Sequence, residues 1–445
     1  MMRSLYSGVA GLKTHQTKMD VIGNNIANVN TVGFKSSSVT FSDIMYQTTQ
    51  QASGANATTG TGGVNAKQIG LGVSTAATKV SITSSGAAET TGNGFDIMLN
   101  DSNATNFFIV NNGTENVFTR DGSFYIDNAG NLCMASTGYN VMGWQVDADG
   151  NIVKDTVSAL RVMKAANLTS APEATTLATC SGIIDKNDTN LEDGLAMNLT
   201  VYDNLGYSYI VKFSITADAT NTTDDYNVYT ATISGITDSN GDAVDFGDMD
   251  DTTFSMYFNT TDGSFAGINA ADDDASTFTI DLSELGNSFE DVTIDFTDTQ
   301  NVDNGGVSTI SMDAGDADGD GAGKKLGAMT GVSIDNTGKI YGTYDNGNTV
   351  LLGQIAVAQF ANASGLEALG DNCYATTLNS GEFDGIGVDI SADGGSMTTG
   401  ALEMSNVDLS SEFTSMITTQ RGFQANSRII TTSDSMLEEL INLKR

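Results

Sequence analysis

The chain contains little cysteine, histidine and proline, and each shortage excludes a class of protein. Its 445 residues include three cysteines, one histidine and one proline. The cysteines, Cys133, Cys180 and Cys373, are far apart and too few for a disulfide framework in a chain of this length. Because there is no C-x-x-C pair and His15 is the sole histidine, we expect no structural zinc site.

Long hydrophobic runs are also missing. No stretch of about 18 consecutive apolar residues occurs, so we expect no helix that spans a membrane. The first residues lack a continuous apolar segment and an A-x-A cleavage pattern, so we expect no cleaved secretory signal. If the protein leaves the cell, it is expected to use an export route that removes no leader.

Basic side chains are scarce and unevenly placed. The chain has 19 Lys and Arg residues against 55 Asp and Glu residues, which gives a net charge of −36. The basic side chains Arg3, Lys13, Lys18 and Lys35 stand near the N-terminus, so the acidic excess lies in the middle. Such a middle would repel phosphate, which excludes nucleic acid as an expected partner. The charge favours a solvated protein and fits an extracellular location.

Catalytic patterns are absent as well. A Ser-His-Asp triad would need His15, which belongs to a helical segment far from the β-rich middle. Glycine is abundant, so a chance G-x-G-x-x-G carries little information, and no phosphate-binding loop stands out. We therefore expect no enzyme and no cofactor.

Apolar residues recur every seven positions at both ends of the chain. This spacing predicts helices over residues 3–30 and from about Gly400 to Leu443, each with one apolar stripe. A helix with such a stripe needs a second helix to cover it, so the ends are expected to pair with each other, with other copies, or both. The stripe residues are Leu5, Leu12, Met19, Ile26, Leu402, Leu409, Met416, Phe423, Ile430 and Leu437.

Between the ends, short alternating strands and Asp/Asn/Gly turns dominate. The predicted fold is multidomain α+β, with the terminal helices paired as a coiled-coil-like core and nested all-β domains in the middle. Residues 1–35 with 400–445 form the helical core, and residues 36–77 form an extended connector with room for a short hairpin. Residues 78–146 with 331–399 form a first β-domain. Residues 147–330 form an inserted outer region of one or two β-domains.

Several long motifs resemble those of the bacterial flagellar rod and hook protein family. Residues 4–12 (SLYSGVAGL) and 20–35 (DVIGNNIANVNTVGFK) are similar to its N-terminal signature. Residues 405–409 (SNVDL) and 420–428 (QRGFQANSR) are similar to its C-terminal signature. Residues 119–124 (TRDGSF) and 353–358 (GQIAVA) are similar to the two arms of its first β-domain. Residues 147–330 match no motif of the family.

The resemblance implies a self-assembling structural subunit. Within the family, the large acidic insertion and the ending NLKR look like the hook, a flexible curved tube that transmits torque from rod to filament. It implies a homopolymer that contacts rod, hook-cap and hook–filament junction proteins, and subunits that pass through the flagellar type III export apparatus. The implied location is the extracellular flagellar hook. A distal rod or hook-associated protein is the alternative within the family.

Four further hypotheses remain open at this stage. Asp316, Asp318 and Asp320 begin like a calcium loop, which would suit a secreted calcium-binding adhesin, but the twelfth position is Gly327 instead of glutamate. Lys164 and Cys180 resemble the pair that some spirochaete hook proteins join between subunits as lysinoalanine. His15 either titrates near neutral pH or is a polar packing residue. Both terminal segments are expected to be disordered in the free monomer and to fold on assembly.

Overall fold

The computed structural model describes residues 2–55, 60–147, 150–246, 252–270, 275–285 and 288–443. The chain forms two compact units. The first comprises Met1–Lys164, Val332–Tyr341 and Leu351–Arg445, and the second comprises Ala165–Gly331 and Gly342–Val350. The first unit is therefore built from both arms of the chain, and the second from the middle.

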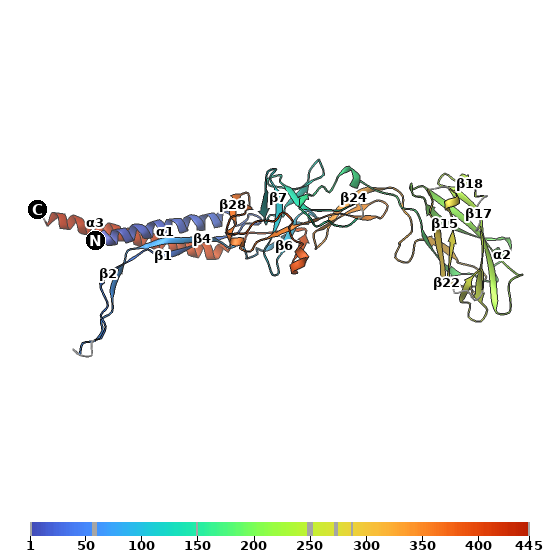
Figure 1. Ribbon diagram of the computed structural model, residues 1–445, viewed down its shortest axis with the longest axis horizontal. Helices are drawn as coiled ribbons and strands as arrows, with labels where there is room; N and C mark the ends of the chain where they lie inside the picture. The colour runs from blue at the N-terminus through green and yellow to red at the C-terminus, as the bar shows by residue number, and fades with distance from the viewer. Residues whose placement is uncertain are drawn as a thin grey trace. The chain divides into compact units, whose positions relative to one another are not determined.

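Two long helices, α1 (Met2–Ala27) and α3 (Leu409–Asn442), pack side by side in the first unit (Figure 1). They run antiparallel, because Ser4 contacts Ser433 whereas Asn25 contacts Glu412. Helix α1 ends at Ala27, just before the asparagine-rich turn and Gly33, which has a φ of 69°.

The expected start of the last helix near Gly400 is wrong. Residues 401–403 form strand β31, in which Leu402 pairs with Glu89, so Leu402 does not belong to the helical stripe. The helix begins at Leu409 because the Asp408 side chain caps it, accepting the N–H of Ser410 at 2.9 Å. Leu402 therefore continues the seven-residue spacing of the helix only by coincidence, because it lies in a strand and the capping residue separates it from the helix.

Residues 37–50 and 67–80 pair as the two arms of a long antiparallel hairpin, where an extended connector with a short hairpin was expected. Strand β1 (Ser37–Asp43) pairs with β4 (Val73–Val80), and β2 (Tyr46–Gln50) pairs with β3 (Lys67–Gly70). The β1–β4 section lies against α1, while β2 and β3 are exposed along their whole length. Figure 1 shows the β2 end of the hairpin leaving the helices.

The β-sheet of the first unit joins strands from the outgoing and returning arms. Val357 pairs with Phe108, Cys373 with Thr119, and Gly143 with Ile355. Phe107, Phe118 and Trp144 belong to its core and are each at most 2% exposed. Its strands in this unit are β7 (Asn106–Asn111), β8 (Asn116–Thr119), β9 (Phe124–Ile126), β10 (Leu132–Met134), β11 (Asn140–Gln145), β12 (Ser158–Ala159), β27 (Val357–Gln359), β28 (Glu367–Gly370) and β29 (Cys373–Ala375). Two separate pairs also join the arms: β5 (Ala88–Thr90) with β31 (Ala401–Glu403), and β6 (Ile97–Asn100) with β30 (Ser396–Thr399). Two short 3-10 helices, η3 (Ala363–Gly365) and η4 (Ile390–Asp393), lie in the returning arm.

The second unit contains two sheets that share one hydrophobic core. One sheet has the order β15-β16-β17-β19-β20, with β18 on β17, and the other β21-β22-β14-β23. Phe213 and Phe254 from the first and Phe296 from the second belong to one buried cluster, so these sheets form a single domain. The elements are η1 (Ala165–Asn167), β13 (Thr169–Ser170), β14 (Leu177–Ile183), α2 (Asn190–Asp193), β15 (Leu195–Tyr202), β16 (Ser208–Ala217), β17 (Tyr226–Asp238), β18 (Ala243–Val244), β19 (Thr253–Asn259), β20 (Phe265–Ile268), β21 (Thr277–Ile280), η2 (Ser283–Leu285), β22 (Val292–Gln300) and β23 (Ser311–Ala314). Strands β24 (Gly327–Ile334), β25 (Lys339–Tyr344) and β26 (Thr349–Ile355) contribute residues to both units.

Aspartate-capped turns explain part of the acidic composition. In the pattern Asp-x-x-Gly-x, the first carboxylate accepts backbone N–H groups two and four residues later, and the glycine takes a positive φ. Asp127 accepts from Ala129 and Asn131, and Asp238 accepts from Asn240 and Asp242. Backbone donors hold the pKa of both carboxyls below its ordinary value. These aspartates serve as turn formers as well as solubilising charges.

The candidate calcium loop is one of these turns. The Asp316 carboxylate accepts the N–H groups of Asp318 at 3.0 Å and of Asp320 at 2.9 Å. Within the described ranges, no three or more His, Cys, Asp or Glu side chains gather where they could hold a metal ion. The structure therefore gives Asp316 a local structural role.

Candidate functional site

The interface between α1 and α3 is lined by small residues. A Cβ atom on Gly8 would lie 3.2 Å from Ile430, and one on Gly11 would lie 2.6 Å from the Asn426 amide. On α3, a Cβ atom on Gly422 would lie 2.7 Å from the His15 ring. The helix axes therefore approach closely, because glycine leaves room for side chains of the opposite helix.

The predicted stripe residues lie at the edges of this interface. Eight of them, Leu5, Leu12, Met19, Ile26, Met416, Phe423, Ile430 and Leu437, are half-buried, and Leu409 is 39% exposed. The positions that are fully buried are Gly8, Gly11, Thr14, Ile22 and Asn25 on α1, and Thr419 and Ser433 on α3. Sequence reasoning missed these small residues; the pair of glycines three positions apart was the available signal. The role of the stripe between subunits stays a prediction.

Large apolar side chains remain exposed on the outer faces of the helix pair. Tyr6 is 69% exposed on α1, and Ile417 and Ile441 are 58% and 69% exposed on α3. Solvent-facing apolar patches of this kind mark interaction surfaces. Among the described residues, no helix is long and apolar enough to cross a membrane.

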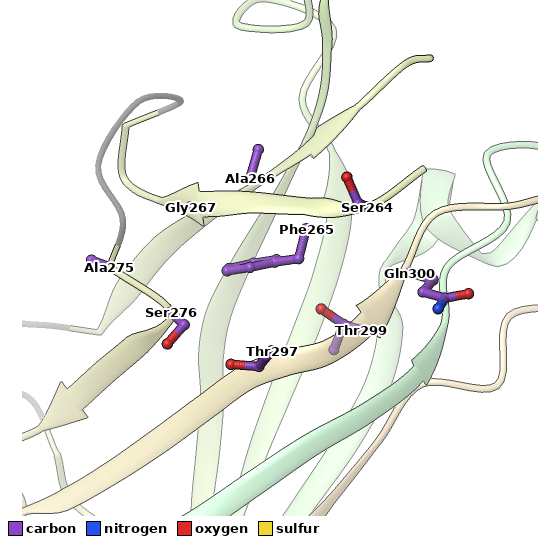
Figure 2. Close-up of a pocket in the computed structure, with 9 residues that line it drawn as sticks. All are labelled: Ser264, Phe265, Ala266, Gly267, Ala275, Ser276, Thr297, Thr299 and Gln300. Atoms are coloured by element: carbon purple, nitrogen blue, oxygen red, sulfur yellow. The ribbon is translucent and has the colours of Figure 1, made fainter. Parts of the chain in front are cut away.

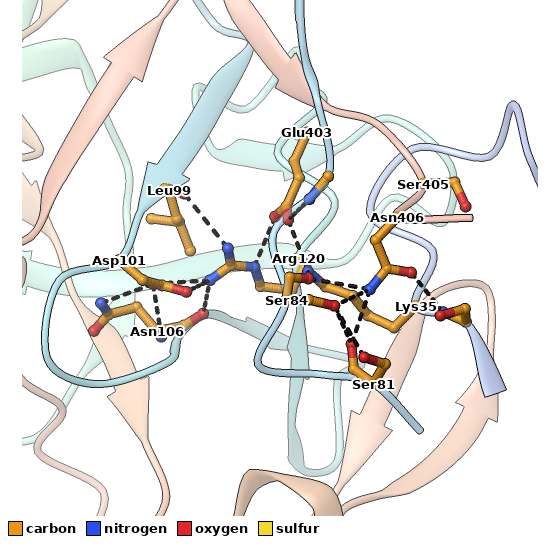
Figure 3. A network of polar contacts seen from close by, with 12 residues as sticks. Lys35, Ser81, Ser84, Leu99, Asp101, Asn106, Arg120, Glu403, Ser405 and Asn406 are labelled. Carbon is orange, nitrogen blue, oxygen red and sulfur yellow. Dashed lines mark hydrogen bonds and ion pairs between the residues drawn. The ribbon is translucent and has the colours of Figure 1, made fainter. Parts of the chain in front are cut away.

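A buried network of charges joins the helices to the first β-sheet (Figure 3). Glu403 lies between Lys35, whose Nζ is 2.7 Å away, and Arg120, whose Nε is 2.8 Å away. Arg120 also reaches Asp101 at 2.9 Å and donates to the Asn106 carbonyl. The side chains of Lys35, Arg120 and Glu403 are at most 1% exposed. Two cations and two anions thus balance where water cannot screen them.

Electrostatics keeps Glu403 ionised in this network. Burial alone would raise its pKa, but Arg120 and Lys35, together with the Gly86 N–H, outweigh burial and hold the pKa below its ordinary value. Lys35 additionally donates to the Ser84 carbonyl at 2.8 Å. The folded structure therefore contains these side chains in their charged forms.

Two asparagines complete the junction between the two helices, the hairpin and the first β-sheet. Asn25, at the end of α1, donates to the Ser37 carbonyl and to Glu412 of α3, and accepts the Ser37 N–H. Asn406, just before α3, accepts the Ser36 N–H at 2.7 Å and donates to the Ser81 carbonyl at 2.9 Å. These side chains fix where both helices meet the hairpin, which gives the motif asparagines a physical role.

His15 lies inside the helix pair as a packing residue. Its ring meets Phe41 edge-on at 5.8 Å between centroids. Its Nδ1 atom is buried and has no hydrogen-bond partner among the residues that the structure describes. Burial, followed by the charge of Lys18, lowers its pKa below the ordinary value of 6.5. The neutral ring is the form that the interface accommodates.

We expect the helix pair to lose stability as the pH falls from neutral to mildly acidic values. Because the folded pKa of His15 lies below the unfolded value of 6.5, protons bind the unfolded chain first, and stability falls below that pH. Thermal unfolding of assembled polymers, followed by helical circular dichroism, measures the effect. In His15→Phe the drop between pH 7 and pH 5.5 should shrink; an unchanged drop would contradict the assignment.

The two residues proposed for a covalent crosslink differ in exposure. Lys164 is half-buried at the end of a segment of the first unit. Cys180 is 0% exposed, in strand β14 of the second unit. Burial, followed by the charge of Asp313, raises the pKa of Cys180 to about 12. The crosslink stays a prediction, and it requires the Cys180 thiol to become accessible.

In the folded monomer we expect Cys180 to resist alkylation. A raised pKa leaves little thiolate, and the thiolate is the nucleophile, so iodoacetamide should label Cys180 at least about a hundredfold more slowly than in denaturant. Peptide mass spectrometry reports labelling site by site. Equal rates in the native and denatured chain would contradict this expectation. In assembled material, a Lys164–Cys180 peptide lacking the thiol sulfur would support the crosslink, and intact Cys180 throughout would remove it.

A pocket in the second unit lacks the groups that catalysis needs. It has a volume of about 280 Å³ and lies beside strands β20 and β22 (Figure 2). Phe265 forms its floor and stacks on Phe296, and the remaining lining side chains are small or carry a hydroxyl or amide. None of the nine lining residues is ionisable in the neutral range.

Both ends of the chain match families of flagellar proteins. Residues 5–35 match the family described as "Flagella basal body rod protein". Residues 398–443 match the family described as "Flagellar basal body rod FlgEFG protein C-terminal". The first segment contains Asn25 and Lys35, and the second contains Glu403 and Asn406. The matched segments thus include residues from both sides of the buried junction.

Similar proteins also extend over the whole chain. The flagellar hook protein FlgE of Borreliella burgdorferi is 35% identical, with 100% of both chains covered. The flagellar hook protein FlgE of Treponema pallidum is 34% identical, again with 100% of both chains covered. The flagellar basal-body rod protein FlgG of Bacillus subtilis is 30% identical, with 100% of both chains covered. The similarity therefore includes the second unit as well as the matched termini.

Proposed function

The chain belongs to the bacterial flagellar hook protein family, and on this premise we propose that it is the structural subunit of the hook. Copies assemble into a flexible curved tube that transmits torque from the rod to the filament. The resemblance predicted from the terminal motifs is confirmed, and the relatives are structural flagellar proteins rather than enzymes.

The observation that carries the proposal is the apolar outer surface of the helix pair. Tyr6 and Val9 on α1, and Phe413 and Ile417 on α3, are each at least half exposed. Burying apolar surface is worth roughly 25 cal/mol per Å², a term that a polymer repeats at every subunit contact. In this role the terminal helices act as a coiled-coil-like core. The predicted domain division, the stripe and the disorder of the termini in the free monomer belong to the same proposal.

The proposed partners follow from the location. They are other copies of the chain, rod and hook-cap proteins, and hook–filament junction proteins. Export through the flagellar type III apparatus, without a cleaved signal peptide, is part of the same proposal. The subunit would reside outside the cell in the hook.

Two alternatives are less favoured. A distal rod protein is also similar over the full length, but its identity of 30% is lower than the 34% and 35% of the two hook proteins. A calcium-binding adhesin would need ligands in the loop at Asp316, and there the carboxylate accepts backbone N–H groups instead.

Electron microscopy of polymers grown from the purified chain tests the function. Curved tubes are the expected result. Straight rods would favour the rod alternative, and a chain that never polymerises would contradict both. Protease digestion of the monomer tests the terminal segments: rapid trimming of both ends supports disorder before assembly, and a resistant full-length chain refutes it.

A further inference from the structure

The last two turns of α3 extend beyond the start of α1, the helix that packs against the rest of α3. Ser4, near the start of α1, already lies opposite Ser433. Residues 436–443 therefore pass the first residue of α1, and Figure 1 shows the C-terminus beyond the N-terminus. We call this segment the overhang.

The overhang is apolar and acidic. Met436, Leu440 and Leu443 follow the spacing i, i+4, i+7 and are 48%, 50% and 81% exposed. Such spacing places them on one face of a helix. Glu438 and Glu439 are its charged side chains among the described residues, and both are exposed. A protruding helix of this composition needs a groove that is apolar with a basic rim.

The first unit carries such a groove between α1 and the base of the hairpin. It has a volume of about 410 Å³, and Arg3, Tyr6, Val9, Lys13, Ile44 and Leu71 line it. The hairpin packs closely against α1 at this groove, because a Cβ atom on Gly72 would lie 3.1 Å from the Cβ of Ala10. Four of these side chains supply the apolar surface, and Arg3 and Lys13 supply positive charge.

The groove and the overhang also match in length. From Arg3 to Lys13 the groove follows α1 for about 15 Å, and the eight residues of the overhang span about 12 Å. The overhang cannot reach the groove of its own chain, because Gly8, in the α1 segment that lines the groove, lies beside Ile430, more than two helical turns before Leu440.

We propose that the overhang of one subunit docks in the α1–hairpin groove of a second copy of this chain. The inference rests on the proposed polymer and names one of its contacts. Since overhang and groove are different surfaces, the contact is head-to-tail, and repeated head-to-tail contacts generate an open helical polymer instead of a closed dimer. Glu439, which borders the apolar face of the overhang, then meets the basic rim formed by Arg3 and Lys13.

Cysteine crosslinking of mixed polymers tests the contact. Two full-length variants, Val9→Cys and Leu440→Cys, are mixed, assembled and oxidised. The native cysteines are all buried and give little background. A mixed disulfide dimer is expected, because the two sulfur atoms come within bonding range only across the proposed contact. The matched control pairs Val9→Cys with Phe413→Cys, which is exposed on α3 outside the overhang, and should give no dimer.

Charge reversal provides a second readout that does not need a disulfide. The double variant Arg3→Glu/Lys13→Glu should raise the critical concentration for assembly about tenfold, and adding Glu438→Lys/Glu439→Lys should restore it. Lys67→Glu/Lys79→Glu reverses two exposed charges of the hairpin outside the groove and should change nothing. Normal tubes without the mixed disulfide and without the charge effect would overturn the docking proposal and leave the hook function standing. Wild-type chains that form no polymer would overturn both.

Discussion

Replacing Glu403 by alanine is expected to destabilise the first unit by about 3–5 kcal/mol, the usual cost of leaving a buried charge without its partner. Lys35 and Arg120 both contact this carboxylate and are at most 1% exposed. Its removal leaves two cations against the single carboxylate of Asp101. Urea unfolding followed by the fluorescence of Trp144, the single tryptophan, which is buried in the first unit, measures the change. In thermal unfolding followed the same way, the melting temperature should fall by about 10 °C.

Glu367→Ala is the matched control, because Glu367 is an exposed glutamate on strand β28 of the same unit. It should change the free energy of unfolding by less than about 0.5 kcal/mol. Since the pKa of Glu403 lies below its ordinary value of 4.5, its stabilisation is complete above that pH and is lost as the pH falls through the folded pKa. A Glu403→Ala chain as stable as the control would refute the role given to the network.

Gly122→Ala is expected to cost about 3 kcal/mol, at the upper end of overpacking substitutions. A Cβ atom at Gly122 would overlap the backbone carbonyl of Ile97, which no rotation of a side chain can relieve. The Ile97 N–H donates to the Gly122 carbonyl at 3.0 Å, so the two segments are pressed together. Moving them apart would also disturb the neighbouring Arg120.

Gly94→Ala serves as the control for this substitution. Gly94 is exposed and has no atom within 4 Å of an added Cβ. Equilibrium unfolding in urea compares the two variants. If both lose the same stability, the cost comes from glycine replacement as such, and the close approach to Ile97 is unimportant.

Short-range sequence patterns predicted the helices and strands better than they predicted the buried charge network. The heptads located both helices, and alternation located strands such as β15 and β16, because these signals lie within a few residues of each other. The network of Lys35, Arg120 and Glu403 joins residues up to 368 positions apart. Their motifs were visible in the sequence, but no local pattern indicates that three charged side chains meet in a buried site.

The start of the last helix and the small residues of the helix interface were missed for a different reason. Heptad reasoning looks for large apolar residues, and it placed Leu402 in a helix although a capping aspartate follows at Asp408. The positions that allow close approach are Gly8, Gly11 and Gly422. Small residues contribute little hydrophobicity to a sequence pattern, and their importance becomes visible only when the opposite helix is in place.

The pairing of early strands with late ones dictates an order of folding. β7 needs β27, β8 needs β29 and α1 needs α3, so the first unit stays incomplete until the last hundred or so residues have arrived. The second unit is nearly contiguous in sequence and has its own core. A chain that emerges N-terminus first from a narrow passage would therefore fold its second unit early. Its N-terminal segment would stay unpaired until the C-terminal segment has emerged.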